Sequence, residues 1–275
     1  MIYAVVLLIG LLVGSFLNVC IVRLPRGRSI VSPPSHCPRC KTKIRFYDNI
    51  PVVSCMLLRG RCRSCGEPIS WRYPLVELMN GLFYLWIVHE FWITGEAVLL
   101  MALCSSLIVI TFIDFDFQII PDVITFPGML LGVLLGPFFM QPLSEPLPFQ
   151  LGHLLPQTGL LLLGFLNSVI GLLCGALPLF TIGWLWEKLR HEEGMGGGDV
   201  KLMGMIGSFL GWKGAFLAIF LGAIVGSIVG LSLMMLKLHK RGQVIPFGPF
   251  LALGAVMTAF YGSDIIVWYL NLTRT

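Results

Sequence analysis

Two groups of aspartates in this sequence could do chemistry. The first is Asp199, which follows three consecutive glycines in the stretch 194–203. Glycine lacks a Cβ and adopts φ values closed to other residues, so the chain can turn tightly there and admit another backbone. The second group is Asp114, Asp116 and Asp122, three aspartates within nine positions at the end of an apolar run. Ionisable groups at a membrane boundary are costly, and their presence indicates function.

Asp114 and Asp199 are candidates for an acid/base pair. Two carboxylates close together cannot both ionise cheaply, so they share a proton; one then activates water while the other protonates the carbonyl or the leaving amine. At about 100° per residue, Asp114 and Asp116 point about 200° apart on a continuous helix, so at most one faces the interior. The residues alone do not choose between them. Asp122 follows Pro121 and is placed to cap the next helix.

A second chemical centre is a pair of Cys-x-x-Cys knuckles separated by twenty-one residues. Four thiolates at this spacing suit tetrahedral zinc in a closed, structural site. Iron is one alternative, and free or redox-active thiols are another. Disulfides are disfavoured if the segment lies in the reducing cytoplasm. The four cysteines are Cys37, Cys40, Cys62 and Cys65.

These residues belong to a chain that is too apolar for a soluble protein of its length. It has 275 residues, of which 56% are hydrophobic and 12% charged, and its mean hydropathy is +0.87. Because about 20 apolar residues cross a bilayer as a helix, the composition predicts an all-α polytopic membrane protein. We expect about eight transmembrane helices, and the sixth is short and interrupted by glycine. The stretches are 2–20, 75–93, 97–113, 123–140, 159–186, 200–212, 215–236 and 246–270.

Lysine and arginine set the orientation, because cytoplasmic loops collect them. Eleven of the nineteen lie in the polar segment 22–74. If this segment is cytoplasmic, eight crossings place six more inside and leave only Lys213 and Arg274 outside. Both termini are then external, and Asp114 and Asp199 both lie at the cytoplasmic face. The six are Lys188, Arg190, Lys201, Lys237, Lys240 and Arg241.

The sequence therefore predicts three parts. Residues 1–21 form a first transmembrane helix, which we interpret as a retained anchor because no basic region precedes it. Residues 22–74 form a cytoplasmic four-cysteine domain that is too small to hold a large core unaided. Residues 75–275 form a transmembrane domain of about seven helices. Asn18 could bond a neighbouring helix. Glu77 follows Pro74 closely and is expected in the first turn of its helix, where a carboxylate is stabilised by the helix dipole.

Other chemistries have little support. The sequence contains no HExxH helix, no GxSxG nucleophile elbow and no GxxxxGK[ST] phosphate loop. Its net charge of +5 is a property of the loops, and basic patches interleaved with aromatic residues, as nucleic acid would need, are absent. The residues alone favour a membrane aspartyl hydrolase. The alternatives are an ion- or proton-coupled transporter that uses the aspartates and a noncatalytic assembly factor that docks through the cysteines.

The sequence also resembles the type IV prepilin leader peptidases, which are membrane aspartyl proteases with a GxGD motif. The resemblance covers nearly the whole chain and is carried by six features in a fixed order. They are GSFLNVCIVRLP at 14–25, the two cysteine knuckles, RYPLVEL at 72–78, IDFDFQIIPD at 113–122, GMGGGDVKL at 194–202 and PFGPFLA at 246–252.

The resemblance implies that a short basic leader is cleaved from prepilins or pseudopilins at the cytoplasmic face of the bacterial inner membrane. In many members with cysteine knuckles, S-adenosylmethionine then methylates the new N-terminus. The catalytic aspartates would be Asp114, eight positions before the aspartate of the Pro-Asp pair, and Asp199, which ends the GxGD motif. Asp114 is thus selected over Asp116, and the four cysteines match the metal-binding set. No role follows for Glu77 or Asn18.

Overall fold

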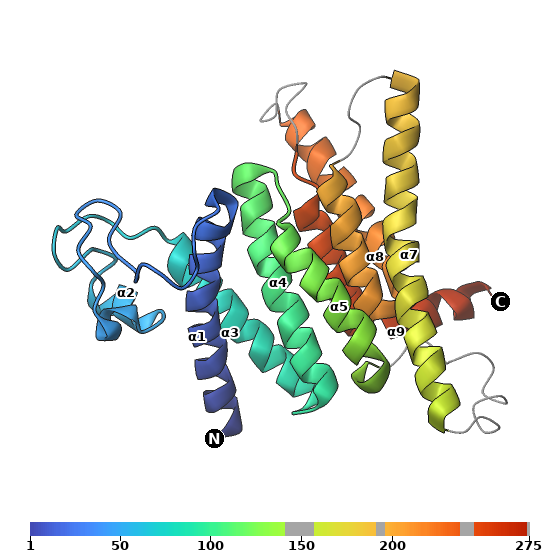
Figure 1. Ribbon diagram of the computed structural model, residues 1–275, viewed down its shortest axis with the longest axis horizontal. Coiled ribbons are helices and arrows are strands. Elements are labelled where there is room, and N and C mark those ends of the chain that lie inside the picture. Colours follow the sequence, from blue (N-terminus) through green and yellow to red (C-terminus); the bar gives the residue numbers. More distant parts are fainter. Residues whose placement is uncertain (141–156, 191–195, 237–244, 274–275) are drawn as a thin grey trace. The chain divides into compact units, whose positions relative to one another are not determined.

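The structure is a computed structural model that describes residues 1–140, 157–190, 196–236 and 245–273 (Figure 1). These residues are almost entirely helical, and the only β pairing among them is two isolated bridges. The all-α prediction is therefore confirmed. The proline-rich segment before α7 lies outside the described residues. So do four of the lysines and arginines used to set the orientation, which are Lys237, Lys240, Arg241 and Arg274.

Seven long helices account for most of the described chain. They are α1 (Ile2–Arg23), α3 (Arg72–Phe91), α4 (Gly95–Phe117), α5 (Asp122–Phe139), α7 (Gln157–Arg190), α8 (Gly197–Met235) and α9 (Gly248–Thr273). Short helices η1 (Leu24–Arg26), η2 (Phe46–Asn49) and α2 (Val53–Leu57) lie between α1 and α3. The chain divides into two compact units, 1–113 and 114–275, with the boundary inside α4.

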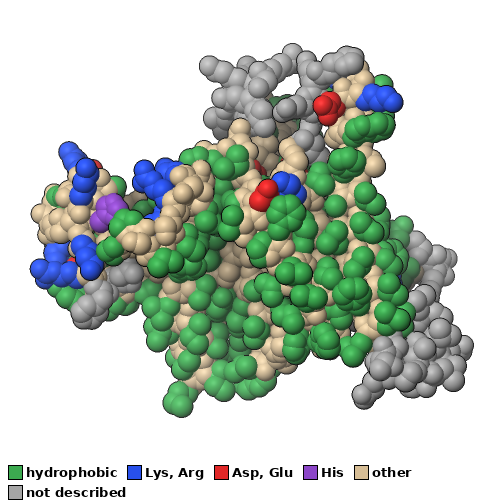
Figure 2. Space-filling view, in the orientation of Figure 1, with side chains coloured by type: hydrophobic (Ala, Val, Ile, Leu, Met, Phe, Trp, Pro, Cys, Tyr) green, Lys and Arg blue, Asp and Glu red, His purple; other side chains and the backbone are tan. Residues whose placement is uncertain are grey.

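Six of the described helices are long and apolar enough to cross a membrane. The predicted count of eight is not confirmed. The stretch 75–93 is the helix α3, which is not among the six. The sixth and seventh stretches are joined in α8, where Gly211 interrupts the helix with φ 71° and ψ −178°. In Figure 2, hydrophobic side chains cover the outside of the helices, as lipid contact requires.

The first part of α8 is the core of the second unit. Every residue from Leu202 to Gly211 is buried, so this helix is enclosed on all sides. Glycines of α7 allow the enclosure, because a Cβ on Gly171 or Gly175 would collide with carbonyl oxygens of α8. Small residues let membrane helices approach to backbone contact. The stretch 200–212, which is short for a membrane crossing, is therefore a buried helix around which the second unit packs.

In the first unit, α1 and α3 pack antiparallel along one face. A Cβ on Gly14 would lie 2.7 Å from the Cα of Glu77, and Asn18 Nδ2 donates to the Tyr73 carbonyl at 3.0 Å. These contacts are four residues apart on both helices, which is the spacing of a single helix face. The predicted bond from Asn18 to a neighbouring helix is confirmed.

A buried polar network ties α3 to α1 and α4. Asn80 Nδ2 donates to the Gly10 carbonyl of α1 at 2.7 Å, and Ser105 of α4 donates to Asn80 Oδ1 at 2.8 Å. The hydroxyls of Tyr84 and Ser105 are 3.2 Å apart. Hydrogen bonds of this kind hold helices together where apolar contact gives no preference over lipid.

Candidate functional site

Asp114 lies in the last turn of α4 and is only 6% exposed. Its Oδ2 accepts a hydrogen bond from the backbone N–H of Gly248 at 3.0 Å, and Gly248 is the first residue of α9. The first N–H groups of a helix have no partner inside it and form its positive end, so they suit a carboxylate. Asp116, two residues further along, is exposed. The start of α9 therefore fixes the orientation of the Asp114 carboxylate.

Asp199 is the third residue of α8 and is half-buried. It lies close enough to Asp114 for the two carboxylates to interact electrostatically. Both residues belong to the second compact unit, 114–275. The fold thus brings together two aspartates that are 85 positions apart in the sequence.

Ile120, in the link between α4 and α5, packs beside two glycines that adjoin the aspartates: Gly198, which precedes Asp199, and Gly248, which bonds Asp114. A Cβ on Gly198 would lie 2.9 Å from the Cβ of Ile120, and a Cβ on Gly248 would lie 3.4 Å from its Cδ1. Among the described residues, nothing lies within 4 Å of the corresponding position on Gly197. Close packing therefore requires a glycine at position 198, whereas Gly197 has no such neighbour in the part of the chain that the structure describes.

The prediction that Asp122 caps α5 is wrong. The N-cap is Pro121, and no side chain caps the helix. Asp122 instead accepts hydrogen bonds from Lys201 Nζ at 2.7 and 2.9 Å. The ammonium also lies 5.5 Å from the ring centre of Phe126. An exposed pair of this kind contributes about 0–1 kcal/mol, but it joins the start of α5 to α8 two residues beyond Asp199.

The four predicted cysteines form one cluster in the first unit. Their sulfur atoms all lie within 4.8 Å of one another, and Cys37 Sγ is 3.8 Å from Cys65 Sγ. Ligands about 2.3 Å from a tetrahedral zinc ion would have their sulfurs about 3.8 Å apart. The cluster therefore has the ligand number and the spacing of a tetrahedral metal site. An ion pair between Arg39 and Glu67 joins the two knuckles.

The two knuckles repeat one backbone arrangement. In the first, the N–H of Cys37 donates to Thr42 and the N–H of Lys41 donates back to Cys37, at 3.0 and 2.9 Å. In the second, Cys62 and Gly66 take the equivalent positions, at 2.8 and 2.9 Å. The residue after each knuckle has positive φ, 58° at Lys41 and 73° at Gly66. The chain thus presents both pairs of thiols through the same local turn.

This turn also favours thiolates. The side chain and then the backbone of Thr42 hydrogen-bond the Cys40 sulfur and lower the pKa of its thiol to about 6. Backbone N–H groups of Cys65 and Ser64 lower the pKa of Cys62. The backbone of Glu67 lowers the pKa of Cys65, but burial and hydrogen bonds with the other three cysteines outweigh it and raise that pKa to about 11. The thiolate is the form that binds metal, so one thiol in each knuckle, Cys40 and Cys62, is favoured in the metal-binding form.

Glu77 is the sixth residue of α3 and is buried. The prediction that Glu77 lies in the first turn of its helix is wrong, because α3 begins at Arg72 and has no acidic residue in its first turn. Glu77 Oε2 accepts a hydrogen bond from the backbone N–H of Val52 at 2.8 Å. Glu77 therefore ties the four-cysteine segment to α3.

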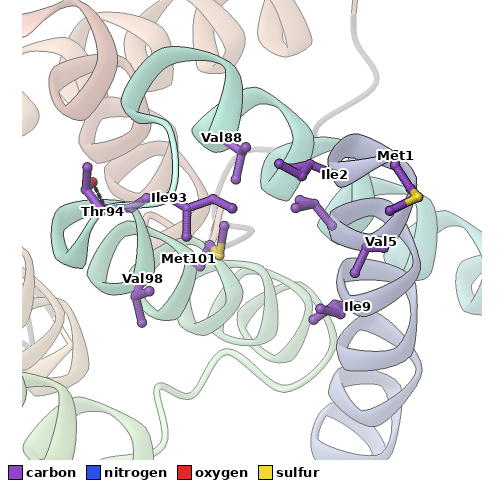
Figure 3. Close-up of a pocket in the computed structure, with 11 residues that line it drawn as sticks. Met1, Ile2, Val5, Ile9, Val88, Ile93, Thr94, Val98 and Met101 are labelled. Atoms are coloured by element: carbon purple, nitrogen blue, oxygen red, sulfur yellow. Dashed lines mark hydrogen bonds between the residues drawn. The ribbon is translucent and has the colours of Figure 1, made fainter.

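A cavity of about 330 Å³ lies at the first turns of α1 (Figure 3). Its lining comes from α1, the end of α3 and the start of α4, and contains no charged side chain. The cavity belongs to the first unit, whereas Asp114 and Asp199 belong to the second. Its apolar walls fit neither peptide hydrolysis nor the charged groups of S-adenosylmethionine.

Two family models match the chain in succession. The Bacterial Peptidase A24 N-terminal domain matches residues 8–91, which include the four cysteines. The Type IV leader peptidase family matches residues 101–231, which include Asp114 and Asp199. The cysteine cluster therefore lies inside the first matched region, and the two aspartates lie inside the second.

Curated relatives match almost the whole chain. A prepilin leader peptidase/N-methyltransferase of Aeromonas hydrophila is 36% identical over 98% of this chain and 94% of its own length. The proteins of that name from Pseudomonas putida and Pseudomonas aeruginosa are 33% and 34% identical, over 94% and 96% of this chain and 90% and 92% of their own lengths. The chain belongs to the prepilin leader peptidase/N-methyltransferase family. The comparison with solved structures found no match.

Sequence reasoning about this prepilin leader peptidase family member missed two neighbours of the aspartates. Gly248 was noted only within PFGPFLA, as part of a helix entry, and Ile120 was not considered. Gly248 contributes through its backbone N–H, which every residue except proline possesses. No residue type could therefore have marked it, and its motif was the only signal.

Proposed function

We propose that the protein is a membrane aspartyl endopeptidase that removes the short basic leader of type IV prepilins or pseudopilins and then methylates the new N-terminus. The observation that carries the proposal is that Asp114 and Asp199 belong to one compact unit and lie close enough to interact electrostatically. The names of the relatives support the substrate and both reactions. The comparisons give no support to a transporter.

In the proposed reaction the two carboxylates share one proton and titrate as a pair. One accepts a proton from the attacking water, and the other donates a proton to the scissile carbonyl or the leaving amine. The N–H of Gly248 holds Asp114 in place. No described residue lies within 4 Å of a Cβ built on Gly197, and we assign this side of the glycine to an extended substrate backbone next to Asp199.

We further propose that the site faces the cytoplasm from a bacterial inner membrane, with both termini outside. The support is the concentration of eleven lysines and arginines in 22–74, since basic loops stay inside. A prepilin presents a basic leader ahead of an apolar helix, so its scissile bond lies at the membrane boundary. Asp114 near the end of α4 and Asp199 near the start of α8 suit that depth.

For the four cysteines we propose structural zinc, with iron as the alternative. Cys37, Cys40, Cys62 and Cys65 would hold it, in a domain of residues 22–74 between the helix 1–21 and the peptidase domain 75–275. Bound there, zinc supplies rigidity to a segment with little core of its own. S-adenosylmethionine is the proposed methyl donor. No cavity described above fits it, so its site is assigned to no residue.

The direct test uses the purified full chain in lipid with a prepilin that carries its leader. Mass spectrometry should detect loss of the leader, followed by gain of one methyl group only when S-adenosylmethionine is added. A prepilin with the glycine before the cleavage site replaced serves as the control and should remain intact. An uncleaved natural substrate would contradict the proposal, and cleavage without methyl transfer would leave a peptidase alone.

Two adjacent glycines provide a matched pair for testing the packing beside Asp199. Gly198→Ala should lower the cleavage rate about tenfold to a hundredfold, because its Cβ would meet Ile120 at 2.9 Å and small displacements of catalytic groups cost rates of this order. Gly197→Ala should cleave at nearly the normal rate. The comparison is made on purified proteins. Equal rates for both variants would rule out the packing role, and a loss confined to Gly197→Ala would point to a substrate contact there instead.

Gly248→Ala should lower the rate of leader cleavage by displacing the Asp114 carboxylate. The added Cβ would lie 2.7 Å from Asp114 Oδ2, so the carboxylate must move from its hydrogen bond with the backbone. We expect a loss of cleavage of about a hundredfold with normal accumulation in the membrane. Gly230→Ala in α8 is the control, since its nearest described neighbour would be 3.9 Å away. Full activity of Gly248→Ala would show that α9 does not position Asp114.

A further inference from the structure

The short helix α2 presents an unusual surface for a part of the basic four-cysteine segment. Its Met56 and Leu57 are 73% and 76% exposed, and Val53 is also exposed. Cys55 and Ser54 of the same helix point elsewhere, with Ser54 buried. A small domain that projects three apolar side chains from one turn needs a partner for them.

The depth of α2 is fixed by Glu77. The N–H of Val52, the residue before α2, donates to Glu77 Oε2 at 2.8 Å, and Glu77 packs against Gly14 of α1. Gly14 lies nine residues before Arg23, the last residue of α1. At 1.5 Å per residue this places the start of α2 about 14 Å from the end of α1, measured along the helix.

The headgroup level can be located on both helices. Arg23 ends α1, and the exposed Trp71 is the N-cap of α3; these are residue types that anchor at the membrane interface. Glu77 lies six residues beyond Trp71, or about 9 Å along α3. Both helices therefore place the start of α2 about 9–14 Å below the headgroup level. Interfacial helices bury their apolar face about 5–10 Å into the boundary with the acyl chains.

The backbone before α2 is strained at the residue that makes this contact. Val52 has φ 59° and ψ −50°, and the N–H of Val53 reaches the carbonyl of Pro51 at 2.5 Å. A β-branched residue at positive φ is rare, and strain of this kind persists only where surrounding contacts hold it. The bond to Glu77 is such a contact.

Charge selects lipid over the substrate leader as the partner. Arg59 and Arg61 follow α2 directly and are exposed, and Figure 2 shows Lys and Arg side chains gathered over this part of the chain. Basic residues beside an apolar surface are attracted to anionic headgroups. A leader that is itself basic would be repelled.

We propose that α2 is an interfacial membrane anchor: Val53, Met56 and Leu57 insert among lipid acyl chains, while Arg59 and Arg61 bind the phosphates of anionic lipids. The inference requires that α1 crosses the membrane and does not depend on the peptidase reaction. The anchor holds the four-cysteine domain against the bilayer surface through α2 as well as through its two flanking helices.

The wild-type chain can be tested in nanodiscs of phosphatidylethanolamine and phosphatidylglycerol. A carbene photoreagent with a long alkyl chain, dissolved in the bilayer, should label Val53–Leu57, as mapped by mass spectrometry of peptides. Val31 is the internal control, because it is 86% exposed in the same domain and its loop is bonded to Arg23 at headgroup level. Labelling of α2 no higher than at Val31 would overturn the proposal, and a crosslink to added pilin in its place would identify a protein partner.

Two further experiments test separately the insertion of the apolar side chains and the binding of anionic lipid by the arginines. Leu57→Glu should lose the label from α2, because a carboxylate is costly among acyl chains, whereas Val31→Glu should leave it unchanged. Replacing phosphatidylglycerol with phosphatidylcholine should reduce labelling in the wild type. Labelling that persists in Leu57→Glu would overturn the insertion, and labelling independent of lipid charge would overturn the role of the arginines. Retained leader cleavage shows that each variant is folded.

Discussion

Changing either Asp114 or Asp199 to asparagine is expected to abolish leader cleavage while the protein still accumulates in the membrane. Asparagine keeps the shape of the side chain but cannot accept and return the proton. An acid or base group in an active site typically increases the reaction rate by a factor of about a hundred to ten thousand. Because the two carboxylates act as a unit, the double variant should be no slower than either single variant. Cleavage of a co-expressed prepilin, followed by its shift in mass, measures the effect.

Asp116→Asn is the matched control for this prediction. Asp116 lies two residues from Asp114 on the same helix but is exposed, whereas Asp114 is 6% exposed. The control should therefore cleave normally. Normal cleavage by Asp114→Asn or Asp199→Asn would refute the proposed reaction. The alternative of a docking factor predicts that the cysteines matter and the aspartates do not.

The second large effect is expected at the cysteine cluster. Changing any one of the four cysteines to serine should release the metal and unfold the segment between α1 and α3. In small metal domains the free energy of metal binding, about 10–16 kcal/mol for zinc, is the free energy of folding. The described part of this segment has few buried apolar side chains, with Cys37 itself among them. Metal content and cleavage by trypsin at Arg59 and Arg61 measure the loss.

Cys55→Ser is the control, because Cys55 lies in the same segment but outside the cluster. It should retain the full metal content and resist trypsin. The aspartates belong to a separate compact unit, so we expect the cluster variants to retain some leader cleavage in fresh membranes. A Cys37→Ser protein with undiminished metal would contradict a four-cysteine site. Equal metal loss in Cys55→Ser would mean that general unfolding, not ligand removal, is responsible.

The sequence by itself determined the class of the protein and the cysteine cluster. Helices that cross a bilayer must be long and apolar, so composition alone predicted an all-helical membrane protein. Cys-x-x-Cys is a local motif whose two thiols are brought together by one turn, and only the pairing of the two knuckles required folding. The order of the six motifs predicted the family. The periodicity of a helix indicated that Asp114 and Asp116 could not both face the interior.

Only the tertiary structure decided which groups surround Asp114 and Asp199. The Gly248 N–H that holds Asp114 comes from a helix start 134 positions away, and backbone groups carry no residue signature. Asp122 bonds Lys201 instead of capping α5, because a long ammonium from another helix competes with local backbone donors. The short stretch after Asp199 became a buried core helix that breaks at Gly211. Length and hydropathy describe one segment at a time, whereas burial depends on which segments pack around it.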